Sequence, residues 1–199
     1  VSSDGKKNDK NWTKEQLMDI LKNHITNVVS HWKGKVHEWD VCNEVLEDDQ
    51  SIVYSDPNGY TLRQESVWTK VCGEEYIDSA FVWAHRADPD AILILNDYSV
   101  ESKGYAKTEA FYNLYKRLRK DGIPVHGVGS QTHVDASINY ISSVEANVSR
   151  FNNDGVTFHF TEVDLKNNNV SEASRLQQAK NYYSLARIAM KYDNCKEFM

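Results

Sequence analysis

Two short segments of this chain place carboxylates directly after apolar stretches. Residues 38–44 read Glu-Trp-Asp-Val-Cys-Asn-Glu, and residues 158–164 read Phe-His-Phe-Thr-Glu-Val-Asp. Cleavage of a glycosidic bond needs one carboxyl group that gives a proton to the leaving oxygen. It also needs a second carboxyl group that stays ionised to attack or stabilise the anomeric carbon. Two carboxylates delivered from the ends of two parallel strands would meet both needs.

The surrounding sequence alternates between helical and strand patterns, which predicts the elements that must position these carboxylates. A helix begins at Thr13, with Gln16 completing a capping box, and ends at Gly34. The other predicted helices cover residues 74–87, 107–121, 138–152 and 172–191. The predicted strands cover residues 36–42, 92–95, 125–131 and 156–161, and residues 45–64 form a long polar loop. The last helix is expected to bury one face, made of Leu176, Ala179, Tyr183, Ala186 and Met190.

Strands that are apolar on both faces and alternate with helices predict a parallel sheet covered by helices. Each of the four strands is followed by polar residues: 43–44, 96–98, 131–133 and 162–164. One acidic residue after a strand is usually a helix cap or a solvated loop residue. Four such clusters together favour an active site at the carboxyl end of a β/α barrel.

The spacing within two of these clusters adds detail. Side chains two residues apart on a strand point the same way, so Gln131 lies beside His133 and Glu162 beside Asp164. A histidine between two carboxylates can donate a proton to each, which would hold a nucleophilic carboxylate in place. The alternative for His133 is an ordinary loop histidine. The other six histidines lie in predicted helices, at strand starts or within strands, away from the carboxyl ends.

The composition excludes several classes of function. The net charge of −6 is spread along the chain and argues against a nucleic-acid partner. No apolar run approaches the roughly 20 residues of a membrane span, and no signal peptide is visible in the chain. Three cysteines at unrelated spacings predict neither a metal site nor a disulfide framework, and Cys42 is expected to be a buried thiol. We expect no cofactor and no metal.

Four segments together resemble the signature regions of glycoside hydrolase family 10. They are residues 39–44, 96–98, 127–133 and 161–164, supported by His24-Ile25, Ala80-Phe81 and Ala87-Asp88-Pro89. The resemblance covers about residues 12–195. It implies an α/β fold, a (β/α)8 or TIM barrel, and retaining endo-β-1,4-xylanase activity. It departs at Cys42, where an aliphatic residue is expected, and in the Ser130 and Thr132 that flank Gln131.

The resemblance also implies roles for individual residues. Glu44 would be the general acid/base and Glu162 the nucleophile. Asn43 would hydrogen-bond the 2-hydroxyl of the sugar being cleaved, and His133 would bridge Glu162 to Asp164. Gln131 and Tyr98 would line the same subsite. The substrate would be xylan or a xylo-oligosaccharide, and the enzyme would be secreted, periplasmic or at the cell surface.

The resemblance implies a partial barrel, because the four predicted strands match the family's fourth to seventh. Residues 1–12 read as a linker or the exit from an inserted domain such as a carbohydrate-binding module, and residues 13–199 as a partial catalytic domain. The open sheet edges at residues 36–42 and 156–161 would invite completion by the amino-side half of the barrel or by a second copy. The alternative is a catalytically incompetent fragment that binds xylan weakly or self-associates. A generic α/β binding domain is disfavoured by the four polar strand ends.

Overall fold

The computed structural model describes residues 11–199 as an alternation of helices and strands. The helices are α1 (Lys14–Trp32), the 3₁₀ helix η1 (Ser51–Tyr54), α2 (Val67–Cys72), α3 (Glu75–Ala87), α4 (Ala106–Lys120), α5 (Ile141–Asn153) and α6 (Glu172–Lys191). The strands are β1 (Glu38–Asn43), β2 (Ile92–Asp97), β3 (Gly127–Ser130), β4 (His133–Asp135), β5 (Thr157–Phe160), β6 (Asp164–Lys166) and β7 (Cys195–Phe198). The predicted linker at residues 1–12 falls almost entirely outside the described part.

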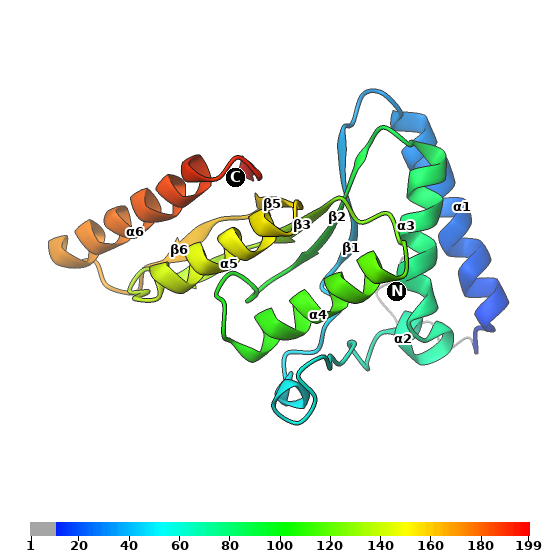
Figure 1. The fold of residues 1–199 in the computed structure, drawn as a ribbon, viewed down its shortest axis with the longest axis horizontal. Helices are drawn as coiled ribbons and strands as arrows, with labels where there is room; N and C mark the ends of the chain where they lie inside the picture. The colour runs from blue at the N-terminus through cyan, green and yellow to red at the C-terminus, as the bar shows by residue number, and fades with distance from the viewer. Residues whose placement is uncertain (1–10) are drawn as a thin grey trace.

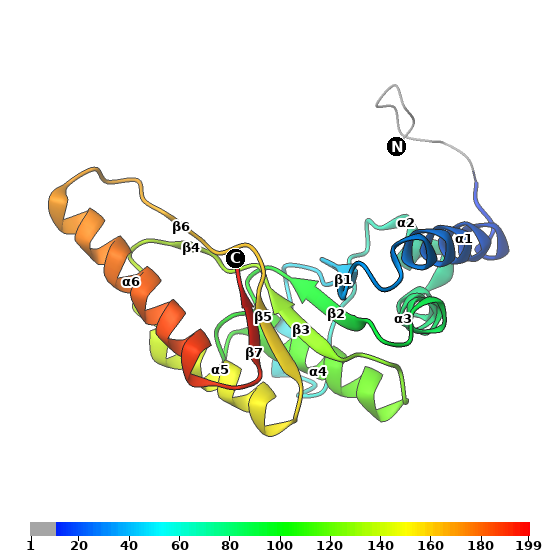
Figure 2. The same cartoon turned by 90° about the horizontal axis from the view of Figure 1, so that it is seen from above.

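The main sheet has five strands in the order β1-β2-β3-β5-β7, and all of its pairings are parallel. Helices α3 to α6 follow an arc around the outer face and the ends of this sheet (Figures 1 and 2). A second, two-stranded sheet pairs β4 with β6 just beyond the carboxyl ends of β3 and β5. The alternation of elements predicts this parallel sheet with its helices, and the arrangement is part of a β/α barrel, as the resemblance implies.

The first helix forms where its cap predicts. The hydroxyl of Thr13 accepts a hydrogen bond from the backbone N–H of Gln16, and the side chain of Gln16 accepts one from the backbone N–H of Thr13. These two bonds satisfy donors that a helix start otherwise leaves unpaired. The helix buries Leu17, Ile25 and Val29 against α3 and leaves Ile20 and Trp32 exposed.

The centre of the sheet is closely packed because two glycines leave room for polar side chains. A Cβ atom at Gly129 would lie 2.4 Å from Oδ1 of Asn96, and one at Gly127 would lie 2.5 Å from Oγ1 of Thr157. Both distances are below van der Waals contact, so only glycine permits the neighbouring side chains to cross the strand here. The apolar core fills the space between the sheet and the helices, and Cys42 is buried within it as predicted.

Three short strands and two short helices, α2 and the 3₁₀ helix η1 within the predicted loop at residues 45–64, were not expected from the sequence. Strand β7 pairs with β5, so the prediction that residues 156–161 form an edge strand is wrong. The edges of the five-stranded sheet are β1 and β7. Strands β4 and β6 have three residues each, and helix α2 lies in a stretch for which no element was predicted.

The predicted buried face of the last helix is also wrong. Leu176, Tyr183 and Met190 are exposed, and α6 packs on α5 through a different stripe that includes Leu185 and Ile188. Both stripes have helical spacing, so the packing of the neighbouring helix decides which one is buried.

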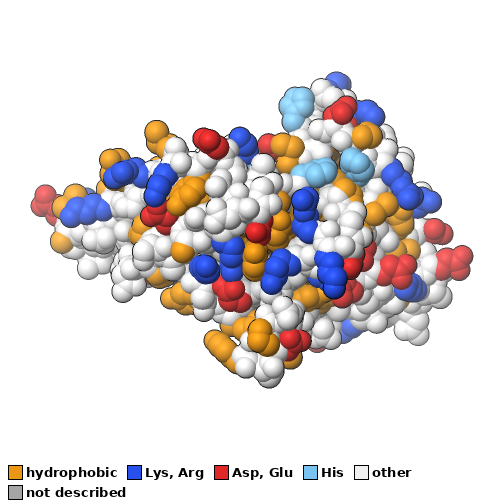
Figure 3. Space-filling model, in the orientation of Figure 1, with side chains coloured by type: hydrophobic (Ala, Val, Ile, Leu, Met, Phe, Trp, Pro, Cys, Tyr) orange, Lys and Arg blue, Asp and Glu red, His pale blue; other side chains and the backbone are white. Residues whose placement is uncertain are grey.

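The surface carries both signs of charge. On the face shown in Figure 3, Lys and Arg side chains are interspersed with Asp and Glu. Among residues 11–199, no helix combines the length and the apolar character needed to cross a membrane.

Candidate active site

The carboxyl ends of β1, β2, β3 and β5 converge, and they bring Glu44 beside Gln131. Glu44 directly follows β1 and has a backbone φ of 56°, in the left-handed region that non-glycine residues rarely occupy. Its Oε1 accepts a hydrogen bond of 3.1 Å from Nε2 of Gln131, and its backbone oxygen accepts one of 3.1 Å from Nε of Arg63. Both the carboxylate and the backbone of Glu44 are therefore held by residues far away in the chain.

Asn43 belongs to the same hydrogen-bonded network. Its Oδ1 accepts bonds from Nε2 of Gln131 at 3.1 Å and from Nδ2 of Asn96 at 3.0 Å. Asn96 in turn accepts a bond of 3.0 Å from the hydroxyl of Thr161, which precedes Glu162. Because both contacts engage Oδ1 of Asn43, its amide nitrogen keeps its donor capacity for another partner, such as a hydroxyl group.

The second carboxylate, Glu162, lies next to His133. Nε2 of His133 is 3.3 Å from Oε2 of Glu162, and Nδ1 is 2.7 Å from Oδ2 of Asp164. The pairing of β4 with β6 sets His133 opposite Asp164 and so produces this bridge. Partial burial of the ring acts to lower the pKa of His133, but the contacts with Asp164 and Glu162 outweigh it and raise the pKa above its ordinary value.

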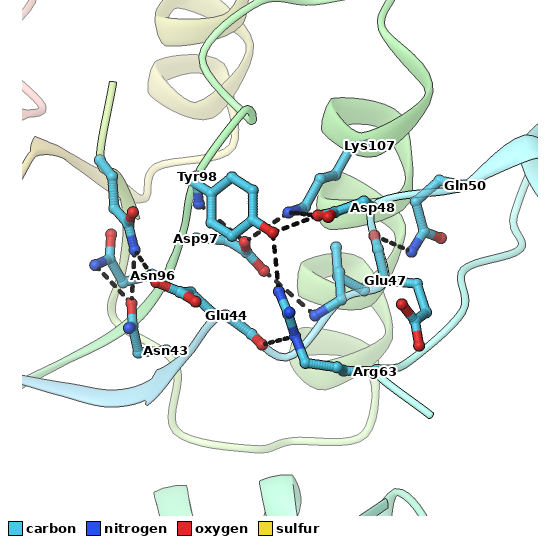
Figure 4. A network of polar contacts seen from close by, with 12 residues as sticks. Asn43, Glu44, Glu47, Asp48, Gln50, Arg63, Asn96, Asp97, Tyr98 and Lys107 are labelled. Carbon is cyan, nitrogen blue, oxygen red and sulfur yellow. Dashed lines mark hydrogen bonds and ion pairs between the residues drawn. The ribbon is translucent and has the colours of Figure 1, made fainter. Parts of the chain in front are cut away.

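A third group of side chains surrounds Tyr98 (Figure 4). The Tyr98 hydroxyl donates to Asp48 and accepts a 3.0 Å bond from Arg63. Nζ of Lys107 lies 3.3 Å from the centre of the Tyr98 ring and 3.0 Å from Oδ1 of Asp97. Hydrogen bonding to Tyr98 lowers the pKa of Asp48, with a further contribution from Lys107. These contacts fix the loop after β1 over the end of β2.

The pair formed by Asp97 and Lys107 is buried at the base of this network. Their side chains are 0% and 7% exposed, respectively. Asp97 also accepts backbone N–H bonds from Leu46 at 3.3 Å and from Tyr98 at 2.9 Å. Burial raises the pKa of Asp97, against the opposing effect of Lys107 and the two N–H groups.

The structure places all seven residues singled out from the sequence around the carboxyl ends of the strands. Gln131 contacts Glu44, and His133, two residues further on, contacts Glu162. Between them, Thr132 has a φ of 61°. The segment from Gln131 to His133 therefore connects the two carboxylates. Tyr98 does not contact either carboxylate directly: it hydrogen-bonds Asp48 and Arg63, and Arg63 in turn donates to the backbone oxygen of Glu44.

Sequence reasoning missed Asp48, Arg63 and Lys107. Asp48 and Arg63 lie in the loop at residues 45–64, and that loop's position after a strand was the signal that it takes part in the site. Lys107 lies in the first turn of α4, where a cation is disfavoured by the helix dipole, and it is buried. A lysine at that position indicates a specific anionic partner, which is Asp97.

Comparison with known proteins shows consistent similarity to xylanases. The family model described as Glycosyl hydrolase family 10 matches residues 5–199. The chain is 43% identical to endo-1,4-beta-xylanase B of Thermotoga neapolitana over 77% of its own length and 41% of that protein. It is 41% identical to endo-1,4-beta-xylanase A of Caldicellulosiruptor sp. over 91% of its own length and 26% of that protein. A relative named exoglucanase XynX, from Acetivibrio thermocellus, is 37% identical over 87% of this chain.

Solved structures show the same partial coverage. The crystal structure of xylanase 10B from Thermotoga petrophila RKU-1 in complex with xylobiose superposes with a TM-score of 0.85 at 40% identity. The match covers 94% of this chain and 54% of that one. TsXylA from Thermoanaerobacterium saccharolyticum, described as an intracellular xylanase, superposes with a TM-score of 0.79 at 35% identity. The chain thus spans about half the length of these proteins, or less.

Proposed function

This chain belongs to glycosyl hydrolase family 10, and we propose that it supplies the catalytic carboxylates of a retaining endo-β-1,4-xylanase. One observation carries the proposal: Gln131 holds Glu44 while His133 holds Glu162, so a three-residue segment connects two carboxylates from the ends of different strands. A retaining glycosidase needs its two carboxyl groups about 5–5.5 Å apart. The short connection supports an arrangement of this kind.

In the proposed reaction, Glu44 is the general acid. It gives its proton to the glycosidic oxygen as the bond from that oxygen to the anomeric carbon breaks. Glu162 attacks the anomeric carbon and forms a covalent glycosyl ester. Glu44, now ionised, takes a proton from water, and the resulting hydroxide displaces Glu162 and releases the sugar with its configuration retained.

The neighbouring residues each have a supporting part. His133 donates toward Glu162 and is held by Asp164, which keeps the nucleophilic carboxylate in place. Asn43 can hydrogen-bond the 2-hydroxyl of the sugar, a contact that strengthens in the transition state. Gln131 donates hydrogen bonds to both Asn43 and Glu44 and so fixes the position of one side chain relative to the other.

Substitution of the two carboxylates in the full-length protein tests these roles. Glu162→Ala should nearly abolish turnover of all glycosides. Glu44→Ala should lose activity on xylan but retain the first step on an aryl xylobioside, because a good leaving group needs no proton. Glu172→Ala, an exposed change on α6, is the matched control and should leave both activities unchanged. The roles are wrong if Glu44→Ala is equally inactive on both substrates.

The substrate is proposed to be xylan. The name of the relative exoglucanase XynX raises the alternative of a β-1,4-glucan, which the same assay with that polysaccharide tests. We expect turnover of xylan to exceed that of the glucan clearly. An inserted carbohydrate-binding module stays a prediction. Export from the cytoplasm also stays a prediction; one structural relative, TsXylA, is described as an intracellular xylanase.

A further inference from the structure

Three side chains that the proposed reaction does not use converge on the concave side of the sheet. They are Glu38 on β1, His159 on β5 and Glu197 on β7. Nδ1 of His159 lies 3.4 Å from Oε2 of Glu38 and 3.6 Å from Oε2 of Glu197, and the three ligand atoms all lie within 4.8 Å of one another. β1 and β7 are the two edges of the five-stranded sheet, so the cluster joins its opposite ends.

The nitrogen at the centre of this cluster is buried and makes no hydrogen bond. The side chain of His159 is fully buried, and its Nδ1 lacks a hydrogen-bond partner because neither carboxylate meets the required geometry. Its Nε2 lies 3.0 Å from the hydroxyl of Thr157, which itself donates to the backbone oxygen of His126 at 3.2 Å. Thr157 must therefore accept, so the ring proton is on Nε2 and a neutral ring carries its lone pair on Nδ1.

A lone pair directed at two carboxylate oxygens is unfavourable unless a positive charge lies between them. A buried acceptor without a partner loses the hydrogen bond that it makes with water in the unfolded chain. The sequence makes room for this arrangement: a Cβ atom at Gly127 would lie 3.0 Å from Nε2 of His159, and only glycine lets the ring lie against β3. The same side of the sheet has a hollow of about 340 Å³, and four of its seven lining residues are acidic: Glu38, Asp40, Glu162 and Glu197.

We propose that Glu38, His159 and Glu197 bind a divalent transition-metal ion, with Zn²⁺ as the best match. Zinc–nitrogen and zinc–oxygen bonds are about 2.0–2.1 Å, so two ligand atoms in a tetrahedral site lie about 3.4 Å apart. The distances from Nδ1 to the two glutamate oxygens match this value without movement of the ring. The hydrogen bond from Nε2 to Thr157 fixes the tautomer, as an outer partner of a metal-bound histidine does. A water molecule from the hollow would complete the four ligands.

The three proposed ligands are distinct from the two catalytic carboxylates, although the hollow beside them also reaches Glu162. Glu38 is the first residue of β1, six residues before Glu44, which corresponds to about 20 Å of extended chain. The ion would have a structural role, because it links β1 and β7 through β5 and neutralises part of the charge in the hollow. A nitrogen ligand disfavours Mg²⁺ and Ca²⁺, which prefer sites made of oxygen atoms alone.

Titration of the metal-free full-length protein with ZnCl₂ by calorimetry tests the proposal without any substrate. We expect one Zn²⁺ per chain and a rise in melting temperature on binding, with no such response to Mg²⁺. Loss of even an outer partner commonly weakens metal binding 10–100-fold. Glu38→Gln and Glu197→Gln should therefore each weaken binding by more than about 100-fold. Glu197 is partly exposed, so its variant is expected to fold, which circular dichroism in EDTA verifies.

Two controls separate this site from other zinc ligands. Glu172→Gln, which changes an exposed helix residue, and Cys195→Ser, which removes the thiol nearest to the cluster in sequence, should bind Zn²⁺ like the unchanged chain. The absorption spectrum with Co²⁺ should show nitrogen and oxygen ligands and no thiolate charge transfer. The proposal is overturned if the unchanged chain takes up no Zn²⁺ at micromolar concentrations. A proton shared between Nδ1 of His159 and the two carboxylates would then supply the positive charge in place of a metal ion. The proposal is equally overturned if Glu38→Gln and Glu197→Gln bind as tightly as the unchanged chain, or if Cys195→Ser abolishes binding.

Discussion

Replacement of Lys107 by methionine tests the polar network beneath the active site. Lys107→Met keeps most of the side-chain volume but leaves Asp97 buried without its cation, 3.0 Å from where Nζ was. Loss of one partner from a buried ion pair costs about 3–5 kcal/mol. Asp97 retains two backbone N–H donors, which compensate part of this loss. We therefore expect the free energy of unfolding to fall by about 2–4 kcal/mol at pH 7, at the lower end of the range for a buried pair.

The other contacts of Lys107 contribute less to this value. Asp48 is 70% exposed, so its pair with Lys107 accounts for at most about 1 kcal/mol. The position of Nζ over the Tyr98 ring adds about 0.5–2 kcal/mol. A double-mutant cycle with Asp97→Asn isolates the pair: the double variant should lose less stability than the sum of the two single variants by about 2 kcal/mol.

Urea unfolding followed by circular dichroism measures these differences. Lys70→Met is the matched control, because Lys70 pairs with Glu65 at the surface, and it should cost less than about 1 kcal/mol. The effect of pH has a definite sign. Burial raises the pKa of Asp97 in the folded state, and removal of Lys107 raises it further, so the folded state binds more protons than the unfolded state. The loss of stability in Lys107→Met should therefore grow as pH rises from the acid range toward 7. A loss below about 1 kcal/mol at pH 7, or a cycle without coupling, would refute this account.

Four further predictions concern the catalytic site and the completeness of the fold. His133→Asn removes the contact with Glu162 and should move the acidic limb of the kcat/KM profile upward; an unchanged profile would make His133 merely structural. Because the folded-state pKa of His133 is raised, the stability it contributes should be fully present below about pH 6.5 and decline as pH rises through that pKa, as thermal unfolding across pH would show. Gln131→Glu places a second carboxylate beside Glu44 and should shift the alkaline limb upward, whereas Gln131→Met should lower kcat/KM without that shift. Residues 1–199 expressed alone should self-associate through β1 or β7 and show little xylanase activity, and a monodisperse monomer with full activity in analytical ultracentrifugation and xylan assays would contradict this expectation.

The elements that could be predicted from the sequence are those with local signals. Thr13 and Gln16 mark the start of α1, and the apolar run at residues 92–95 marks β2. Strand β7 could not be predicted in this way, because Cys195–Phe198 has two charged residues among four and its pairing with β5 is a long-range contact. The wrong face assigned to α6 has a similar cause, since the packing of α5, rather than the helix itself, determines which stripe is buried.

The same distinction applies to the site. Polar residues at strand ends can be found from spacing, and His133 and Asp164 lie opposite each other as their spacing allows. The partners of Tyr98 could not be found, because Asp48 and Arg63 are brought to it by the course of a loop. The sequence pattern indicates only that His159 is a strand residue away from the carboxyl ends. Its relation to Glu38 and Glu197 depends on the curvature that brings β1 and β7 together.

The most direct test of the central claim is to trap the covalent intermediate. A 2-fluoro-xylobioside with a good leaving group slows hydrolysis of the glycosyl ester, so the ester accumulates on the nucleophile of a retaining enzyme. After reaction with the full-length protein and proteolysis, mass spectrometry should locate a single sugar adduct on Glu162, in the peptide that contains Thr161 and Val163. An adduct on Glu44 or on another carboxylate, or hydrolysis with inversion and no adduct, would contradict the assignment of Glu162 as nucleophile and Glu44 as acid/base.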